Sequence, residues 1–596
     1  MIAAEFNMGE GAMTIMQEKL VALNAANVEQ CVSMLEGIYE HSPWIARRAA
    51  SQRPFASLTG LKYAMQQVVL QASPNEQLGL IRAHPELAGK AALAGELTWE
   101  STGEQASAGL NACSAEEYAQ LHELNRAYNA RFGFPFILAV KGPEGTGLDR
   151  QQIIATFARR LQASQASEQA ECLRQIGRIA EIRLNELFAV RHRFGGHIMQ
   201  QVRELAQISE QADGLTCSYL TAVHRQTAQQ LARWMTAAGL ETQIDAVGNV
   251  RGRFSCGKPG AKTLLTGSHY DTVRHAGWYD GRLGILLPLA VLAACREQQI
   301  ALPFDVELIA FAEEEGVRFQ STFLGSRALV GRFGPELLEL QDANHLSLAS
   351  ALQEFGTDMA AIEGLRLDPQ QIAGFIEVHI EQGPVLLQRE LPLGLVTAIA
   401  GSSRYWLHLQ GEANHAGTTP MEMRIDAVAA AAEIVLAIEQ RCQGVPGLVG
   451  TVGLIDVPQG AMNVVAGACS LSIDIRSPVD AGRQAAVAAV ERAIAGICQR
   501  RGVQYRLQPV LEVVASPCTS PLRAALGEAI GRTGLPVFEL PSGAGHDAMM
   551  MAHLTPTAML FVRCGNNGIS HNPLETMTLD DAELAAQVFM DFLCHA

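Results

Sequence analysis

Histidines and carboxylates recur in five short segments of the C-terminal two thirds of the chain. They are His269 and Asp271 in GSHYDTV, Asp280 in YDGRLG, the glutamates 313–315 in AEEEG, His379 in IEVHIEQG and His571 in ISHNPLE. Neutral imidazoles and carboxylates are ligands of hydrolytic zinc-type centres, which keep one coordination position for water. A carboxylate that bridges two cations lets them sit about 3.5–4 Å apart and act on one water. Three adjacent glutamates are costly unless a cation or solvent compensates them, so the pattern predicts a hydrolytic metal centre.

The first third of the chain offers fewer candidates. His84 precedes Pro85 in HPELAGK, and a residue before proline favours an extended or turn backbone. Ser101, Glu104 and Gln105 follow in STGEQASAGL. The spacing of Ser101 and Glu104 is also typical of a capping box at a helix start, and His84 also suits a helix end. The residues alone therefore leave a catalytic and a structural interpretation open.

The elements that must position these residues change character near residue 190. Before it, apolar residues recur at helical spacing, as in Leu58, Leu61 and Met65. After it, helical patterns such as 283–296 separate short β-rich runs that end in polar residues. These runs are 263–272, 304–316, 372–383 and 556–564. We therefore expect an all-α N-terminal domain and an α/β C-terminal domain whose function lies at its strand ends.

A second change of pattern lies inside the α/β part. SLSIDIR at 470–476 alternates like a half-buried strand between Ala-rich helices at 427–440 and 482–499, which predicts a smaller inserted α+β domain. The expected domains are a helical domain over 14–190, a catalytic domain over 197–393 and 507–596, and an inserted lid or dimerisation domain over 394–506.

Composition excludes several function classes. The 596 residues carry a net charge of −16, with no basic cluster that would attract a phosphate backbone. No apolar stretch approaches the length of a membrane span, and the N-terminus lacks the pattern of a secretory signal. The 12 cysteines include no CxxC pair, as is usual for buried thiols in a reducing compartment. We therefore expect a cytoplasmic protein that binds neither nucleic acid nor membrane.

From about residue 197 to the end, the motifs resemble those of di-metal amidohydrolases related to aminoacylases and carboxypeptidases. The resemblance is to the branch of N-carbamoyl-L-amino-acid hydrolases, β-ureidopropionases and allantoate amidohydrolases. It rests on GSHYDTV, YDGRLG, EEEGVRF, HIEQGP, NHAGTTPM, DIRSP, PSGAGHDA and SHNPLE. It implies two divalent cations per chain, zinc or manganese, since such donor sets accept both. The implied ligands are His269, Asp280 (bridging), Glu315, His379 and His571.

The same resemblance implies roles for residues around the cations. Glu314 becomes the general base, and Asp271 fixes the tautomer of His269. One departure is Val317, which stands in EEEGVRF where a small polar residue is common. The implied reaction is hydrolysis of a ureido C–N bond, by water that Glu314 deprotonates.

The inserted domain is implied to complete this site across a homodimer. His415 matches the histidine that polarises the scissile carbonyl in the active site of the other subunit. Gln382, Asn463 and Arg476 match substrate-binding positions, and the guanidinium of Arg476 suits a bidentate grip on a carboxylate.

Over about 14–190, HPELAGK, the S-x-x-E-Q segment, RFGFPFI and IAEIRL resemble 2-oxo-4-hydroxy-4-carboxy-5-ureidoimidazoline (OHCU) decarboxylase. That family is helical, uses no cofactor and makes (S)-allantoin late in urate degradation. The resemblance implies that His84 is the catalytic acid/base and that Glu104 is its acidic partner. Ser101 and Gln105 would bind the ring or the ureido group, and Phe136 and Ile137 would line the pocket through their backbone. Arg183 would bind a carboxylate, although Arg178 lies close enough in the sequence to be an alternative.

Together, the two resemblances predict a bifunctional enzyme that acts on small ureides. A partner domain that makes allantoin favours allantoate as the substrate of the hydrolase. The alternatives are an N-carbamoyl-L-amino-acid, β-ureidopropionate or ureidoglycolate hydrolase, or an N-terminal half that serves only assembly.

Overall fold

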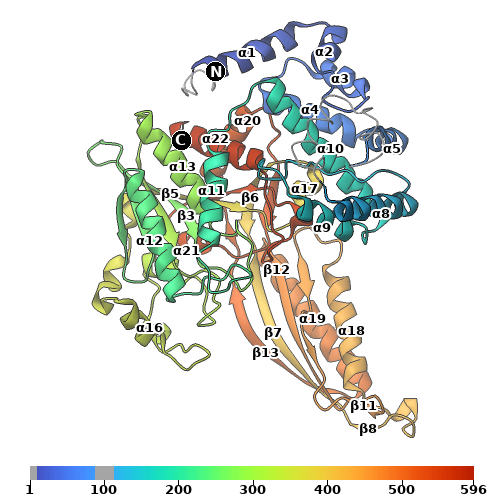
Figure 1. The fold of residues 1–596 in the computed structure, drawn as a ribbon. Coiled ribbons are helices and arrows are strands. Elements are labelled where there is room, and N and C mark those ends of the chain that lie inside the picture. Colours follow the sequence, from blue (N-terminus) through green and yellow to red (C-terminus); the bar gives the residue numbers. More distant parts are fainter. Residues whose placement is uncertain (1–9, 88–112, 596) are drawn as a thin grey trace.

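The computed structural model describes residues 10–87 and 113–595. Figure 1 shows a helical domain at the upper right, a large sheet with its helices at the left and centre, and an inserted domain that extends below. In the described residues, no helix combines the length and the apolarity that a membrane span requires.

In the described part of residues 10–194, all regular secondary structure is helical. The α-helices of the helical domain are α1 (Glu10–Ala25), α2 (Val28–Met34), α3 (Pro43–Ala49), α4 (Leu58–Leu70), α5 (Pro74–Ala83), α8 (Ala115–Phe132), α9 (Arg150–Arg160) and α10 (Gln165–Leu187). Local sequence starts several of them: Ser73 and Glu76 form a capping box on α5, and Asp149 and Gln152 form one on α9.

Two separate hydrophobic cores flank the end of this domain. The core of the helical domain runs along the chain as far as Phe188, and that of the large sheet begins with Phe194. On this basis we propose the domain boundary within 190–197.

The large sheet is mixed and has the strand order β1-β2-β4-β3-β5-β16-β6-β14, with β15 paired to β6. Its strands are β1 (Glu241–Ile244), β2 (Val250–Phe254), β3 (Thr263–His269), β4 (Asp305–Phe311), β5 (Ile372–Ile380), β6 (Leu393–Ile399), β14 (Ser516–Pro517), β15 (Glu539–Ser542) and β16 (Thr557–Val562). The neighbours β4, β3, β5 and β16 run parallel. Their carboxyl ends therefore meet at one edge of the sheet, where open α/β sheets bind their ligands.

Helices cover both faces of this sheet. They are α11 (Gly195–Ala206), α12 (Ala222–Ala237), α13 (Leu283–Glu297), α14 (Leu324–Leu329), α15 (Pro335–Leu338), α16 (Leu348–Phe355), α17 (Val385–Arg389), α20 (Ser520–Arg532), α21 (Asp547–Met551) and α22 (Leu579–His595). Adjacent residues of β3 face different cores: Leu264 packs with α13 and α22, and Leu265 packs with α21. Burial on both faces explains the continuous apolar runs in the sequence.

The inserted domain has its own antiparallel sheet, with the order β10-β12-β7-β13 and β9 paired to β12. Its elements are β7 (Gly401–Gln410), β8 (Asn414–His415), α18 (Ala427–Cys442), β9 (Val449–Thr451), β10 (Ile455–Asp456), β11 (Val464–Val465), β12 (Ala468–Ser477), α19 (Asp480–Arg501) and β13 (Gln504–Val513). The expected bounds of 394–506 need correction, because β6 belongs to the large sheet and β13 pairs with β7. The insert therefore runs from Gly401 to Val513.

Candidate active sites

The predicted metal ligands meet at the carboxyl edge of the four parallel strands. His269 is the last residue of β3, and His379 is the next-to-last residue of β5. The glutamates 313–315 follow β4, and His571 follows β16. Sequence positions about 300 residues apart are thereby brought into one cluster.

Asp280 lies at the centre of this cluster. Its Oδ1 is 3.5 Å from Nε2 of His269 and 3.3 Å from Nε2 of His379, and its Oδ2 is 3.1 Å from Nε2 of His571. Two groups of ligand atoms within 4.8 Å of one another share this carboxylate: His269, Asp280 and His379, and Asp280, Glu315 and His571. One carboxylate oxygen thus faces each group, which is the arrangement that a bridging ligand of two cations requires.

Two glycines of YDGRLG allow Asp280 to reach the sheet. A Cβ on Gly281 would lie 2.5 Å from the carbonyl oxygen of His269, and Gly281 has a left-handed φ of 67°. A Cβ on Gly284 would lie 2.2 Å from the carbonyl oxygen of Val378. Only glycine fits these positions, and the start of α13 can therefore pack directly on β3 and β5.

Asp271 organises the glutamate segment as well as His269. Its carboxylate accepts hydrogen bonds from the backbone N–H of Glu314 at 3.0 Å and of Glu315 at 3.2 Å. Nδ1 of His269 lies 3.4 Å from this carboxylate but only 3.0 Å from the backbone carbonyl oxygen of Asp271. The closest acceptor that would fix the tautomer of His269 is therefore this carbonyl.

The electrostatics of the cluster fit divalent cations. Burial, together with the charge of Asp280, raises the pKa of Glu315 to about 7, and burial holds the pKa of Glu314 well above its usual range. The hydrogen bond to Asp280 raises the pKa of His571 to about 9. Several carboxylates in one buried place stay ionised only if positive charge joins them. This donor set could hold two cations that share Asp280.

The predicted substrate-binding residues fall into two groups. Gln382 is at the cluster, since its Nε2 donates to Oδ2 of Asp280 at 2.8 Å. Arg476 pairs with Asp474 at 2.8 Å and donates to the carbonyl oxygen of Gly543 at 2.7 Å, and so spans from the insert to the loop after β15. His415 and Asn463 lie elsewhere.

His415 and Asn463 are neighbours at the far tip of the inserted domain. His415 pairs with Val464 between β8 and β11, and the N–H of Ala416 donates to the carbonyl oxygen of Asn463 at 2.9 Å. Figure 1 shows this tip well away from the ends of β3 and β5. Within one chain, these two residues therefore do not join the metal-ligand cluster.

The structure adds His546 and Glu377, which the sequence analysis did not select. Both are buried, and each has a ligand atom near that of His379. The ring of His546 lies 4.5 Å from that of His379 between centroids, and its Nε2 is 2.8 Å from Oγ of Ser542. The motif PSGAGHDA contains His546, so the sequence could have indicated this residue. Glu377 stands within the apolar run of β5, and the sequence pattern does not mark it as a possible ligand.

The candidate site of the helical domain is built around His84, which follows α5. Its ring is buried, and Nδ1 lies 3.0 Å from the carbonyl oxygen of Leu80. Burial lowers the pKa of His84 to about 4, although the Leu80 carbonyl and Glu40 oppose this shift. Arg183 is buried close by and pairs with Glu40 at 2.9 Å. The sequence did not indicate Glu40, because no pattern of spacing links it to His84 or Arg183, which lie about 40 and 140 positions later in the chain.

The remaining predicted residues of this site differ in their surroundings. The ring of Phe136 stacks on Phe157 with centroids 3.8 Å apart, and the carbonyl oxygen of Ile137 accepts a hydrogen bond from Arg160 at 2.7 Å. Arg178 pairs instead with Glu181 and Asp580, so Arg183 is the arginine beside His84. Ser101, Glu104 and Gln105 lie outside the described residues.

Comparison with known proteins agrees with this division. Residues 24–185 match the family model of OHCU decarboxylase, and residues 265–595 match that of peptidase family M20/M25/M40. Allantoate deiminase 2 of Glycine max is 38% identical over 423 residues, which are 65% of this chain and 87% of that protein. N-carbamoyl-L-amino acid amidohydrolase of Geobacillus stearothermophilus is 36% identical over 395 residues, which are 66% of this chain and 96% of that protein.

A solved structure gives the same picture for the C-terminal part. An amidase of the hydantoinase/carbamoylase family from Burkholderia multivorans superposes with a TM-score of 0.63 at 30% identity, covering 67% of this chain and 97% of that one. The C-terminal part, with its mixed sheet, therefore has the α/β fold of the carbamoylase-type amidases. On the strength of the matched residues and of these relatives, the chain belongs to peptidase family M20/M25/M40, a family of di-metal hydrolases.

Proposed function

We propose that this chain is a bifunctional enzyme of ureide catabolism. The helical domain decarboxylates OHCU to (S)-allantoin, and the C-terminal part hydrolyses allantoate to ureidoglycine, ammonia and carbon dioxide. The observation that carries the proposal is the union of an Asp280-centred cluster of the M20 type with an OHCU decarboxylase match in one chain. Relatives act on allantoate or on N-carbamoyl amino acids by their names, and a partner domain that makes allantoin favours allantoate.

The hydrolase centre would use the ligands described above. His269, Asp280 and His379 would hold one divalent cation, and Asp280, Glu315 and His571 the other. Bound cations supply Lewis acidity, which polarises a carbonyl group and makes water easier to deprotonate. Zinc and manganese both suit imidazole and carboxylate donors.

Glu314 would move the proton in this reaction. Its carboxyl is buried beside His269 and next to the ligand Glu315. It would accept the proton of the attacking water and deliver it to the nitrogen that leaves when the ureido C–N bond breaks. The resulting carbamate would then release ammonia and carbon dioxide.

Substrate binding would use groups from both the catalytic and the inserted domain. The guanidinium of Arg476 would hold the substrate carboxylate, and Gln382, already bonded to Asp280, would contact the ureido group. The partner subunit's Asn463 would complete the pocket, and the partner subunit's His415 would stabilise the developing oxyanion.

The inserted domain suits a dimer contact. Of the 22 large apolar side chains that are exposed in the described residues, 14 lie in the insert, between residues 401 and 513. Strand β13 is an edge of the insert's sheet, and eight of its ten residues are exposed. The unpaired backbone groups of an exposed edge strand are a template for pairing with another chain. A homodimer through this domain would bring the partner subunit's His415 to the cluster.

In the helical domain, His84 would act as the acid/base. Its low pKa leaves the ring neutral at physiological pH, so it can take up a proton from bound substrate and return it to the carbon that loses carbon dioxide. Arg183 would bind a substrate carboxylate, and part of its present hydrogen bonding to Glu40 would then be lost. Glu104, Ser101 and Gln105 keep the roles predicted for them. No cofactor is required, because the imidazoline ring can accept the electron pair that decarboxylation releases.

The decisive test is product analysis of the purified full chain. OHCU, allantoate, an N-carbamoyl-L-amino acid, β-ureidopropionate and ureidoglycolate are offered in parallel, with and without a chelator. We expect decarboxylation of OHCU in both conditions, and ammonia release with the highest kcat/KM for allantoate only without chelator. A preference for another ureide would overturn the substrate assignment. A full chain that is inert towards OHCU would leave the helical domain with an assembly role only.

A further inference from the structure

The segment between β16 and α22 carries His571 in an unusual backbone. Asn566, Asn567 and His571 all have left-handed conformations, with φ of 52°, 63° and 54°. Such conformations cost free energy in residues other than glycine, and they persist where surrounding contacts fix them. The side chain of His571 is 49% exposed, whereas those of Asp280 and Glu315 are 5% and 8% exposed. Burial therefore restricts the side chains of Asp280 and Glu315 much more than that of His571.

Contacts from the helical domain fix the first part of this segment. Nη1 of Arg159, near the end of α9, donates to Oδ1 of Asn566 at 3.2 Å. Nη2 of Arg174, on α10, donates to Oδ1 of Asn567 at 3.3 Å. Asn566 also donates from Nδ2 to the carbonyl oxygen of Leu574 at 2.7 Å, which closes the segment on itself. The two left-handed asparagines are thus held from outside by two arginines.

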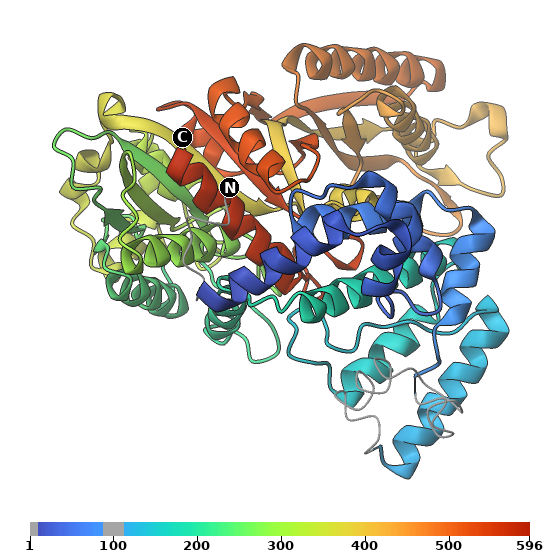
Figure 2. The ribbon, with the colours of Figure 1, turned by 90° about the horizontal axis from the view of Figure 1, so that it is seen from above.

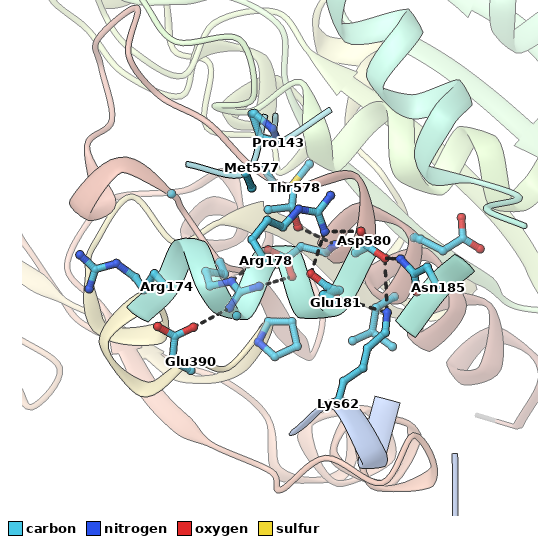
Figure 3. Close-up of a pocket in the computed structure, with 18 of the residues that line it drawn as sticks. Lys62, Pro143, Arg174, Arg178, Glu181, Asn185, Glu390, Met577, Thr578 and Asp580 are labelled. Carbon is cyan, nitrogen blue, oxygen red and sulfur yellow. Dashed lines mark hydrogen bonds and ion pairs between the residues drawn. The ribbon is translucent and has the colours of Figure 1, made fainter. Parts of the chain in front are cut away.

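The helical domain also holds the other end of the segment. The N–H of Leu579 donates to the carbonyl oxygen of Pro143 at 2.8 Å. The next residue, Asp580, is contacted by four side chains of the helical domain and of the connection that follows it. Figure 3 shows Lys62, Arg178 and Asn185 around its carboxylate. The fourth, His192, lies 2.9 Å from Oδ1 of Asp580 through its Nε2. His571 therefore lies between two anchor points on another domain.

Between these anchors, the segment reaches the metal-ligand cluster. Oγ of Ser570 donates to Oδ2 of Asp280 at 3.2 Å and to Glu575 at 2.7 Å. The carboxylate of Glu575 in turn accepts the N–H groups of Tyr279 at 2.8 Å and of Asp280 at 3.2 Å. The position of this segment therefore affects both His571 and the bridging carboxylate.

A cavity of about 1080 Å³ lies between the helical domain and the C-terminal part. Residues of both domains line it, including Arg174 of α10 and Met577 and Thr578 of the segment (Figure 3). Figure 2 shows the helical domain, in blue and turquoise, beside the red helix α22. The bonds to Asn566 and Asn567 and those to residues 579 and 580 act directly on the segment that carries His571.

We propose that the helical domain is a positioning element of the hydrolase, in which Arg159 and Arg174 hold the 566–567 turn so that His571 can bind the second cation. The inference rests on the proposed function, in that Asp280, Glu315 and His571 form a cation site. It adds a dependence of that site on a domain with a different activity. Arg159 and Arg174 are positioning residues, and neither contacts His84 or the cluster itself.

The test measures cation affinity rather than activity alone. Metal-free full-length protein is titrated with Mn²⁺ by calorimetry, with electron paramagnetic resonance to count bound ions. Two ions should bind to the unaltered chain. The double variant Arg159→Ala/Arg174→Ala should bind the first ion as before and the second roughly three- to tenfold more weakly, as expected for the loss of one or two hydrogen bonds. Decarboxylation of OHCU should be unchanged.

Three further variants make the result specific. Ser57→Gly removes a different bond between the domains, that of its Oγ to the carbonyl oxygen of Thr533, which involves no residue between 566 and 580; glycine is tolerated at the start of α4, and both affinities should stay unchanged. Asn567→Gly keeps the left-handed backbone but removes the acceptor of Arg174, so adding Arg174→Ala to it should cause no further loss. His571→Ala should bind a single ion.

These outcomes separate the two hypotheses. If His571→Ala still binds two ions, the cation site itself is wrongly assigned. If His571→Ala binds one ion while the arginine variant keeps wild-type affinity for both, the positioning role is refuted and the proposed function stands. A loss equally large in Ser57→Gly would also refute the specific role of the two arginines.

Discussion

Gly281→Ala should remove cations from the hydrolase centre without altering a single ligand. In the structure, a Cβ at this position would lie 2.5 Å from the carbonyl oxygen of His269 and 2.6 Å from its ring. Ordinary contact begins at 3.4 Å, so one side must move by about 0.9 Å, whereas ligand distances in metal sites hold to about 0.2 Å. The neighbours that must give way are Asp280 and His269, which are both ligands in the proposed centre.

Two costs add up in this variant. Alanine in a left-handed conformation costs about 1–2 kcal/mol relative to glycine, and the displaced ligands should lower cation affinity by about 10–100-fold, as loss of supporting contacts does in other metal sites. Amidohydrolase activity at limiting metal should fall accordingly and recover in part with excess metal. Decarboxylation of OHCU should be unchanged.

Gly248→Ala is the matched control. Gly248 also has a positive φ, of 92°, but a Cβ there meets its neighbours at an ordinary 3.5 Å. It should therefore lose a similar amount of stability in thermal melts of the metal-free protein, yet keep its cation affinity in calorimetry. Wild-type affinity in Gly281→Ala would refute the reasoning, because it would mean that the contact between Asp280 and His269 does not determine cation binding.

Three other predictions test the remaining assignments. Because burial lowers the pKa of His84 from 6.5 to about 4, the folded chain binds fewer protons than the unfolded chain in this window, and its stability should fall by up to about 3 kcal/mol as the pH drops from 6.5 to 4. His84→Asn should flatten that dependence in melts of the helical domain and abolish decarboxylation alone; an unchanged slope would contradict the burial argument. Glu314→Gln should lose about 10²–10⁴-fold in amidohydrolase rate with both ions bound, and Glu315→Gln should lose an ion; metal analysis that gives the reverse would exchange their roles. A mixture of inactive His415→Ala and Glu314→Gln subunits should regain about a quarter of wild-type activity after exchange, because one site in each mixed dimer is intact; a mixture that stays inactive would place His415 in its own subunit's site.

The sequence predicted the four parallel strands β3, β4, β5 and β16, because each lies in a largely apolar run that ends in polar residues, but it did not select the other five strands of this sheet. It failed at the limits of the insert. Leu393–Ile399 is as apolar as any central strand, and periodicity cannot tell which of two sheets such a strand will join. Its partner β16 lies about 160 residues later, and this tertiary pairing decides its domain.

The cluster shows a similar limit. Residue types and strand ends predicted which side chains would meet. The bridging role of Asp280 came only from the family resemblance, because the position of its two oxygens depends on the close packing of α13 against β3. Nor could spacing show that the carboxylate of Asp271 serves two backbone N–H groups rather than mainly the ring of His269. Hydrogen bonds to backbone leave no pattern in side-chain types.

The choice between Arg178 and Arg183 could, however, have been made from the sequence. On an α-helix, positions five apart point about 140° away from each other, so both arginines cannot serve the same site. The apolar stripe of α10, which includes Ile176 and Ile179, faces the core of the helical domain, and Arg183 follows Ile179 by one turn on that side. Arg174 and Arg178 are one turn apart on the other face, where they meet the hydrolase. One helix therefore places a buried arginine beside His84 and two arginines at the interface with the hydrolase, and the period of its apolar residues separates these positions.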